Sequence, residues 1–298
     1  MRTLRFMTPE APIIIVGTGR CGSTIYQQLF AEHPRVAWLS EAARNNPARP
    51  QLNRRALERR AHPLWGRLYR HRVNPGEHYA FWEHYCPGFS RTFRDLLASD
   101  VTERNKKILR EAFGAIAWKE RPRLLIKITG WPKMGFLREV FPDARFIHVV
   151  RDGRAVVNSH LNVPFWKGWE GPENWRWGPL PEKYRDEWEH SGRSFVVLGC
   201  IQWKILMDAF MAAKALVPDD QFFEFRYEDF CARPLEMYRE SVEFAGLEWT
   251  PDFEAVIRGA NIRSKNTKWG EDLTEEQREL VEQSLAGHLR EWGYEENK

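Results

Sequence analysis

The sequence is poor in cysteine: its 298 residues include four, and they are widely separated along the chain. No two of them have CxxC spacing, and no pair of histidines accompanies them, so neither a disulfide framework nor a zinc site is expected. The four are Cys21, Cys86, Cys200 and Cys231. We predict a protein of a reducing compartment that requires no metal.

Long uninterrupted apolar runs are also missing. The longest apolar stretch, Phe195 to Val217, is predicted to be a packed core helix, because a membrane span would tolerate its polar residues poorly. These polar residues are Gln202, Lys204, Asp208 and Lys214. The segment Met1 to Pro12 lacks the apolar region of a signal peptide, so we expect a cytoplasmic protein.

Neither sign of charge dominates. The chain has 45 Lys and Arg against 41 Asp and Glu, a formal net charge of +4, and a pI near 8.9. This mild basicity suits anionic small molecules or headgroups and is too weak to indicate nucleic-acid binding. With 43% apolar residues the chain can bury a full core, and we predict one domain over residues 1–298.

What the sequence does contain is a series of short β-branched runs, each a strand-sized piece. The predicted strands are Ile13 to Val16, Val36 to Leu39, Leu124 to Ile128, Arg145 to Val150 and Phe222 to Phe225. Helical patterns follow several of them. Strands alternating with helices predict an α/β fold, with a mostly parallel sheet and helices on both faces.

Two segments interrupt this alternation, and we predict acceptor-side insertions at 44–110 and 163–193. The first begins with a stretch, 44–72, that holds nine arginines and one glutamate, Glu58. The second holds five tryptophans among prolines and glycines, at positions Trp166, Trp169, Trp175, Trp177 and Trp188. Such insertions at the rim of a sheet commonly carry function.

A glycine-rich turn joins the first predicted strand to a helix. The segment Gly17 to Thr24, GTGRCGST, places free backbone N–H groups at a helix N-terminus, where they can bind an oxyanion. Ser23 stands where a nucleotide-triphosphate loop has its lysine, so the turn is poorly built for ATP hydrolysis. Arg20 supplies charge-assisted donors within the turn. The alternative is a purely structural glycine turn.

A second strand, turn and helix follow in Arg145 to Ser159, RFIHVVRDGRAVVNS, with Arg151 at the end of the strand. At the carboxyl edge of a parallel sheet two such pockets can face one ligand, which then carries two separated anionic groups. Alternatively, Arg151-Asp152-Gly153 is only a tight turn with a local ion pair.

Together these two segments resemble the two signatures of sulfotransferases that use 3′-phosphoadenosine 5′-phosphosulfate (PAPS). The resemblance extends to Phe225–Phe230, FRYEDF, and covers about half of the chain. It implies a P-loop NTPase-like sulfotransferase architecture and a sulfuryl transfer that needs no metal.

The resemblance also implies roles for the residues of both turns. The first turn would hold the 5′-phosphosulfate, through Gly19, Arg20, Cys21, Gly22, Ser23 and Thr24. Arg151 and Ser159 would hold the 3′-phosphate. Lys265 and Lys268, in a late basic loop, would close over that phosphate; as a charge run they can equally be a solvated face.

In-line transfer requires stabilised charge on the leaving group and a base for the acceptor proton. By the resemblance, Arg20 would interact with the leaving oxygen, and Glu41, just after the second strand, is our candidate base. Lys127 is a further catalytic candidate near the sulfuryl group. The alternatives are an exposed loop carboxylate for Glu41 and a solvated strand end for Lys127. Three histidines remain in reserve as bases, namely His33, His148 and His160.

The acceptor stays open at this stage, as do O- against N-sulfation and the oligomeric state. The clustered tryptophans can form a platform for a sugar or an apolar group, or they can simply pack the insertion onto the domain. The arginines of 44–72 can attract an anionic acceptor or allow peripheral contact with a lipid surface, or they can form a solvated helix face. The partners expected are therefore PAPS and a small-molecule, carbohydrate or lipid acceptor, and no nucleic acid.

Two rival functions belong to other classes. A P-loop kinase or NTPase should have a loop lysine, which is replaced here by Ser23. A non-catalytic nucleotide-binding module would keep the Arg151 pocket but would not need Glu41 or an acceptor crevice.

Overall fold

A parallel β-sheet lies at the centre of the protein, whose computed structural model describes residues 9–64, 66–90, 93–175 and 177–294. Within these residues five strands pair in the order β2-β3-β1-β4-β5, and every neighbouring pair is parallel. The strands are β1 (Ile13–Gly17), β2 (Val36–Trp38), β3 (Arg123–Thr129), β4 (Arg145–Val150) and β5 (Phe222–Arg226). The predicted α/β fold with its parallel sheet is confirmed, and each strand ends within a residue or two of its expected bounds.

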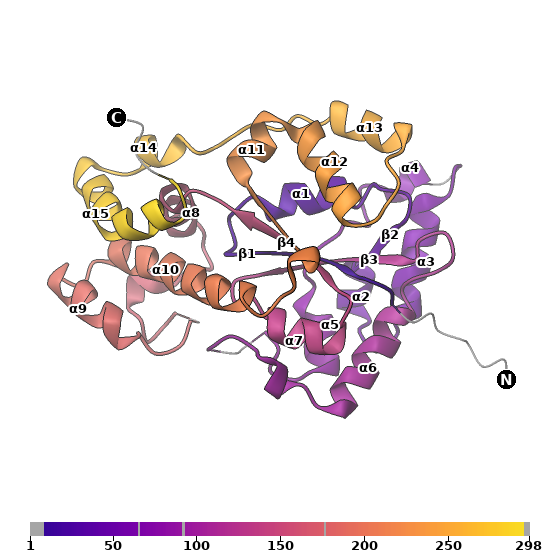
Figure 1. Ribbon diagram of the computed structural model, residues 1–298, viewed down its shortest axis with the longest axis horizontal. Coiled ribbons are helices and arrows are strands. Elements are labelled where there is room, and N and C mark those ends of the chain that lie inside the picture. The colour runs from indigo at the N-terminus through magenta and orange to yellow at the C-terminus, as the bar shows by residue number, and fades with distance from the viewer. Residues whose placement is uncertain (1–8, 65, 91–92, 176, 295–298) are drawn as a thin grey trace.

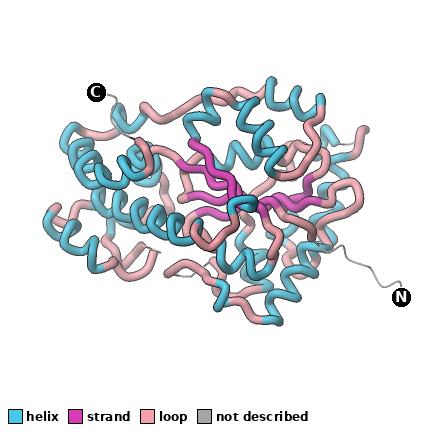
Figure 2. Tube along the Cα trace, in the orientation of Figure 1, coloured by secondary structure: helices cyan, strands magenta, loops and turns pink. Residues whose placement is uncertain are grey.

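Helices cover both faces of the sheet, as the ribbon and the tube show (Figures 1 and 2). One side carries α1 (Ser23–Phe30), α11 (Tyr227–Ala232), α12 (Pro234–Phe244) and α13 (Pro251–Arg258). The other side carries α5 (Tyr79–Tyr85), α6 (Glu103–Gly114) and α7 (Met134–Val140). Short 3₁₀ turns occur at Ala98–Asp100, Gly168–Glu170 and Asp219–Gln221.

A bundle of helices packs beside β4, and it is built on a second and a third apolar cluster. Its members are α8 (Gly153–Leu161), α9 (Glu182–His190), α10 (Phe195–Lys214), α14 (Lys268–Asp272) and α15 (Glu275–Glu291). By length and composition α10 is, among the described residues, the one helix that could cross a membrane, but 72% of its most apolar window is buried inside the structure. Helix α15 begins at Glu275, because Thr274 and Gln277 cap it reciprocally.

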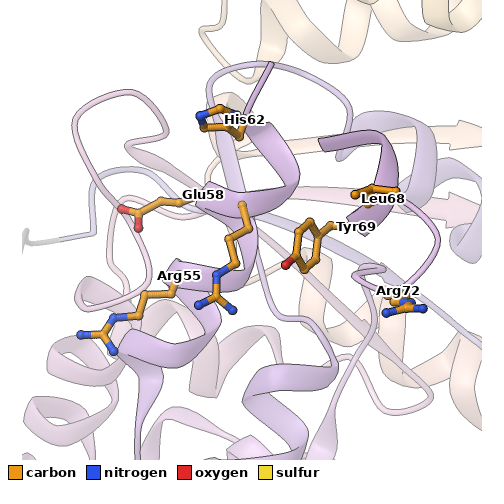
Figure 3. A pocket seen from close by; sticks show the side chains of 7 residues that line it. Arg55, Glu58, His62, Leu68, Tyr69 and Arg72 are labelled. Atoms are coloured by element: carbon orange, nitrogen blue, oxygen red, sulfur yellow. The ribbon is translucent and has the colours of Figure 1, made fainter. Parts of the chain in front are cut away.

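The arginine-rich stretch folds into helices beyond β2. These are α2 (Glu41–Asn45), α3 (Pro50–Ala61) and α4 (Gly66–Tyr69), and α3 contacts both of the others. The outer side of α3 and α4 forms a surface pocket (Figure 3). The segment predicted as the first insertion, 44–110, is therefore mostly helical.

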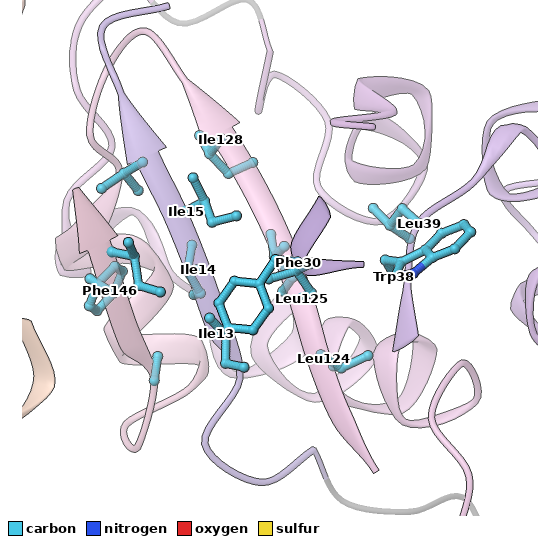
Figure 4. Close-up of a cluster of buried hydrophobic side chains, with 14 of the residues drawn as sticks. Ile13, Ile14, Ile15, Phe30, Trp38, Leu39, Leu124, Leu125, Ile128 and Phe146 are labelled. Atoms are coloured by element: carbon cyan, nitrogen blue, oxygen red, sulfur yellow. The ribbon is translucent and has the colours of Figure 1, made fainter. Parts of the chain in front are cut away.

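Strands β1 to β4 are buried on both faces, which explains why they read as continuous apolar runs, whereas the edge strand β5 is mostly half-buried. Ile13, Ile14 and Ile15 of β1 are fully buried, and the side chains of β3 flank them (Figure 4). Phe30 of α1 and Trp38 of β2 complete this part of the core. The apolar contacts hold the strands in register, so their carboxyl ends meet at one edge.

One charged residue lies deep in the helical bundle. Lys204 of α10 is buried, and its Nζ lies 2.5 Å from Glu187 of α9 and 3.1 Å from the carbonyl of Ser284 in α15. The ammonium group thus joins three helices, and it depends on Glu187 for its counter-charge.

We predict that Glu187→Ala destabilises the protein by about 2–3 kcal/mol, because it leaves the Lys204 charge buried and uncompensated. Lys183→Ala, which removes an exposed ion pair to Asp208, should cost less than about 1 kcal/mol. Urea unfolding followed by circular dichroism measures both values. Equal effects of the two variants would contradict the structural role of Glu187.

Candidate active site

The polar groups of the two glycine turns lie at the carboxyl edge of the sheet. Gly17 ends β1 and pairs with Thr129, which ends β3. Arg151 directly follows β4 on the other side of β1. This is the edge at which ligands bind in open parallel sheets.

The first turn is wound by three residues with positive φ. These are Gly19 at 82°, Arg20 at 57° and Gly22 at 90°, and α1 begins directly after Gly22. A Cβ at position 22 would lie 2.3 Å from the ring of Tyr227, so the turn and α11 meet with no room for a side chain. A non-glycine residue at positive φ such as Arg20 is strained, and such strain is characteristic of functional sites.

Cys21 lies beneath this turn. It is fully buried, and its Sγ packs so close to Gly17 that a Cβ there would stand 2.5 Å away. The side chain therefore fills space below the turn. A covalent role for its thiol has no support in this position.

A cavity of about 720 Å³ opens between α1, α8 and the loop 261–268. Eight of the predicted ligand-binding residues line it: Arg20, Gly22, Ser23, Thr24, Arg151, Ser159, Lys265 and Lys268. Gly19 does not line this cavity, because it lies on the side of the turn that faces Thr129 and His160. The sequence motifs, more than a hundred residues apart, thus share one hollow.

Arg151 is held in a fixed orientation. Its Nη1 donates to the carbonyl of Arg20 at 2.8 Å, and its Nε donates to Oδ1 of Asn266 at 2.9 Å. The guanidinium also stacks over the ring of Tyr227, 4.5 Å from the centroid. Glu228 accepts from the Asn266 amide and fixes that side chain in turn. The alternative, a tight turn with a local ion pair, holds only in part: Asp152 forms its ion pair with Arg154, while Arg151 faces the cavity.

Arg20 and Ser159 join the two turns directly. Nε of Arg20 donates to Oγ of Ser159 at 2.9 Å, across the mouth of the cavity. An anion entering here would meet both side chains at once.

Positive charge dominates the lining of this cavity. Its cationic side chains are Arg20, Arg151, Arg263, Lys265 and Lys268. One carboxylate, Asp272, faces them, and it accepts from the Asn158 amide at 2.8 Å. Such a lining favours a ligand with several negative charges.

Lys127 is buried rather than solvated. Its Nζ donates to Oγ1 of Thr24 at 2.9 Å, at the start of α1, and lies 3.3 Å from Oε1 of Glu77. Thr129 donates to the same carboxylate oxygen at 2.7 Å. Glu77 lies in the loop between α4 and α5 and carries no sequence motif, so the sequence does not predict its contact with Lys127.

Glu41 is the first residue of α2 and is half-buried. Its Oε2 accepts from the backbone N–H of Asn74 at 3.0 Å, and so it braces the loop that leads to Glu77. Oε1 makes no hydrogen bond to the part of the chain that the structure describes. Burial lowers the pKa of the nearby His78, an effect that the Glu41 carboxylate partly offsets.

The reserve histidines occupy different places. His148 is buried in β4, bonded to Glu224 at 2.8 Å, and burial lowers its pKa. His33 is buried and bonded to the carbonyl of Glu248. His160 alone of the three lies next to the first turn, 3.9 Å from where a Cβ of Gly19 would stand.

The tryptophans of the second insertion mostly pack inward. Trp166, Trp175 and Trp177 are buried, and Trp177 lies against Gly130 after β3. Trp169, by contrast, is 59% exposed. Because the other three rings are buried, the cluster does not form a broad aromatic platform on the surface.

Comparison of the sequence with family models supports this picture. The model of the sulfotransferase family matches residues 12–251, which include both turns and Glu41. The chain therefore belongs to the sulfotransferase family. Among curated protein sequences none matches the chain.

Solved structures share the fold. Sulfotransferase STF9 from Mycobacterium avium has 18% sequence identity and a TM-score of 0.58, covering 94% of this chain and 76% of that one. Sulfotransferase STF1 from Mycobacterium tuberculosis H37Rv has 17% identity and a TM-score of 0.47, covering 94% and 77%. Mouse sulfotransferase SULT7A1, complexed with PAP, has 12% identity and a TM-score of 0.45, covering 96% and 86%. The likeness to STF9 shows the fold alone, the P-loop-like fold of sulfotransferases.

We predict that Gly22→Ala weakens the binding of 3′,5′-adenosine bisphosphate about tenfold and lowers stability by about 1–2 kcal/mol. The new methyl group would displace Tyr227, on which Arg151 stacks, and would force alanine into a left-handed conformation. Gly270→Ala is the control, because no atom lies within 4 Å of its Cβ position. Calorimetric titration and thermal unfolding test both variants, and wild-type binding by Gly22→Ala would refute the tight contact.

Proposed function

We propose that this sulfotransferase moves the sulfuryl group of PAPS to a hydroxyl or an amine of an acceptor whose identity is open. The observation that carries the proposal is the cationic cavity in which both turns meet, with Arg151 oriented by three contacts. PAPS has anionic groups at two ends, and two anion-binding turns facing one cavity suit such a molecule.

Each turn would bind one end of the donor. Backbone N–H groups of Gly22 and Ser23, the Thr24 hydroxyl and the N-terminus of α1 would hold the 5′-phosphosulfate. Arg151 and Ser159 would hold the 3′-phosphate, with Lys265 and Lys268 closing over it. Arg151 still has Nη2 for this purpose, since its described hydrogen bonds use Nε and Nη1.

Two cations serve the leaving group. PAPS supplies the sulfuryl group and departs as the bisphosphate, so negative charge develops on the bridging oxygen. Lys127, directed at Thr24 from below the turn, and Arg20, reaching across it, can both stabilise that charge. Glu77 positions Lys127 and prevents its amine from turning away.

We assign to Glu41 the role of the base that accepts the proton of the acceptor. It follows β2 at the same edge of the sheet, and its Oε1 is available to accept a proton. Attack by the acceptor oxygen or nitrogen forms the new bond to sulfur, the bond from sulfur to the phosphate oxygen breaks, and the proton passes to Glu41. His160, beside Gly19, is the remaining histidine with access to this region.

The rival functions lose support. Ser23 replaces the lysine that a kinase or NTPase uses on its phosphates, and the chain belongs to the sulfotransferase family. A purely nucleotide-binding module has no need for a buried lysine and a carboxylate beside the first turn.

We predict that 3′,5′-adenosine bisphosphate binds without metal, and that Arg151→Ala weakens it at least about 30-fold, since a charge-assisted contact is worth about 2 kcal/mol. Arg20→Ala should cost about tenfold, and the exposed Lys119→Ala should cost nothing. Calorimetric titration measures all three variants, with ATP in the presence and absence of magnesium as the competing ligand. Preference for magnesium-ATP, or no binding of the bisphosphate, would overturn the proposed donor.

We also predict that Lys127→Met weakens PAPS at least about tenfold while leaving the bisphosphate within about twofold, because Lys127 contacts Thr24 of the first turn, where the sulfuryl group would bind. Glu77→Gln should act in the same direction with a smaller effect. Glu41→Gln should leave both affinities unchanged and slow release of the bisphosphate from PAPS about a hundredfold, as loss of a base does. Titration and chromatographic assay against a panel of hydroxyl and amine acceptors separate these roles. A loss of PAPS affinity in Glu41→Gln would assign that carboxylate to binding instead.

A further inference from the structure

The two most exposed large apolar side chains among the described residues lie close together in the chain. Leu64 is 78% exposed and Leu68 is 65% exposed, at the corner between α3 and α4. The rest of the arginine-rich stretch packs its apolar residues inward, with Leu57 and Val73 buried. An exposed apolar pair on a strongly basic surface has no role in the fold, and such pairs mark interaction sites.

Beside these leucines lies a pocket of about 720 Å³ with an unusual lining. Arg55, Arg59 and Arg72 face it together with Leu68 and Tyr69 (Figure 3). These three guanidinium groups have no ion pair within the described part of the chain. The one carboxylate nearby, Glu58, is taken by Arg54 at 2.8 Å.

Two other arginines of this stretch, in contrast to those of the pocket, contact the body of the protein. Arg60 pairs with Glu32 and lies over Trp38, and Arg54 lies over Trp118. Those side chains fasten α3 to the body of the protein. The unpaired arginines are on the outer side, where they contribute nothing to packing.

We propose that the corner formed by 55–64 and 66–72 docks on a membrane surface that carries anionic phospholipids. The pocket arginines would take lipid phosphates, and the two leucines would enter the boundary between headgroups and acyl chains. Charge complementarity selects an anionic partner, and the leucines select a membrane. A nucleic acid or a sulfated glycan would engage the arginines and leave the leucines in water.

The location of this corner bears on the transfer reaction. In Figure 1, α3 and α4 lie beyond β2, on the opposite side of the protein from α9 and α15. Helix α3 packs on α2, which begins with Glu41. A consequence that rests on the proposed function is that an amphiphilic acceptor at the lipid surface would be presented on the Glu41 side, not on the nucleotide side.

The test is co-sedimentation of the full chain with vesicles. One set is phosphatidylcholine alone, and the other contains phosphatidylglycerol at roughly one part in three. We expect at least about tenfold stronger binding to the anionic vesicles, weakened by salt. Equal binding to both sets, or no binding to the anionic set, would overturn the proposal.

Two variants separate the two components of docking. Arg55→Gln/Arg59→Gln/Arg72→Gln should lose at least about tenfold in binding to anionic vesicles, since each charge near such a surface contributes. Leu64→Ser/Leu68→Ser should lose at least about threefold, because apolar insertion is removed. Unchanged binding by the leucine variant would assign the surface to a soluble polyanion and refute membrane docking.

A matched control removes three exposed charges elsewhere: Lys107→Gln/Arg185→Gln/Arg290→Gln should bind vesicles as the wild type does. Equal loss in this control would reduce the effect to net charge and overturn the proposal. Circular dichroism establishes that each variant is folded. Titration with the bisphosphate is run in parallel, so that failure of the proposed donor is distinguished from failure of docking.

Discussion

The hydrogen bond from Arg151 to the backbone carbonyl of Arg20 is the interaction on which the site depends. It joins the turn after β1 to the turn after β4, which are 131 residues apart in the chain. The parallel sheet makes this contact possible, because adjacent strands end at the same edge. Three further residues hold the Arg151 guanidinium in place. Tyr227 stacks against it, Asn266 accepts a hydrogen bond from its Nε, and Glu228 accepts from the Asn266 amide.

Lys127 is buried on the other side of the first turn, where it is also held by contacts between distant segments of the chain. An ammonium group in the third strand is stable there because Glu77 and the Thr24 hydroxyl satisfy it. The loop carrying Glu77 is in turn held by Glu41 through Asn74. The carboxylates of Glu41 and Glu77 thus hold Lys127 in place, the first indirectly and the second by contact. On the opposite side of the turn, five cationic side chains line the cavity with one carboxylate, Asp272.

How far the sequence predicts this arrangement depends on the range of the interactions involved. The glycine turns and their strands follow from local patterns and lie where expected, while Arg151 and Ser159, which the family resemblance pairs, both line the cavity. Glu77, Asn266 and the orientation of Tyr227 do not, because their roles come from contacts between distant segments. The tryptophans show the same limit: their clustering is visible in the sequence, but only packing against Gly130 and α10 determines that most of them are buried. The arginines of 44–72 show the same limit. Some of them attach α3 to the body of the protein and others line the outer pocket, and the sequence does not tell the two groups apart.

The contact between Gly22 and Tyr227 has a thermodynamic consequence. Because the ring occupies the space where any side chain at position 22 would stand, the turn and the wall of the cavity cannot shift independently. A donor that enters finds its ligands already in place, so little conformational entropy remains to be lost on binding. Affinity in this cavity should therefore depend on the shape of the ligand as well as on its charge, because the wall does not adjust to ligands of another outline.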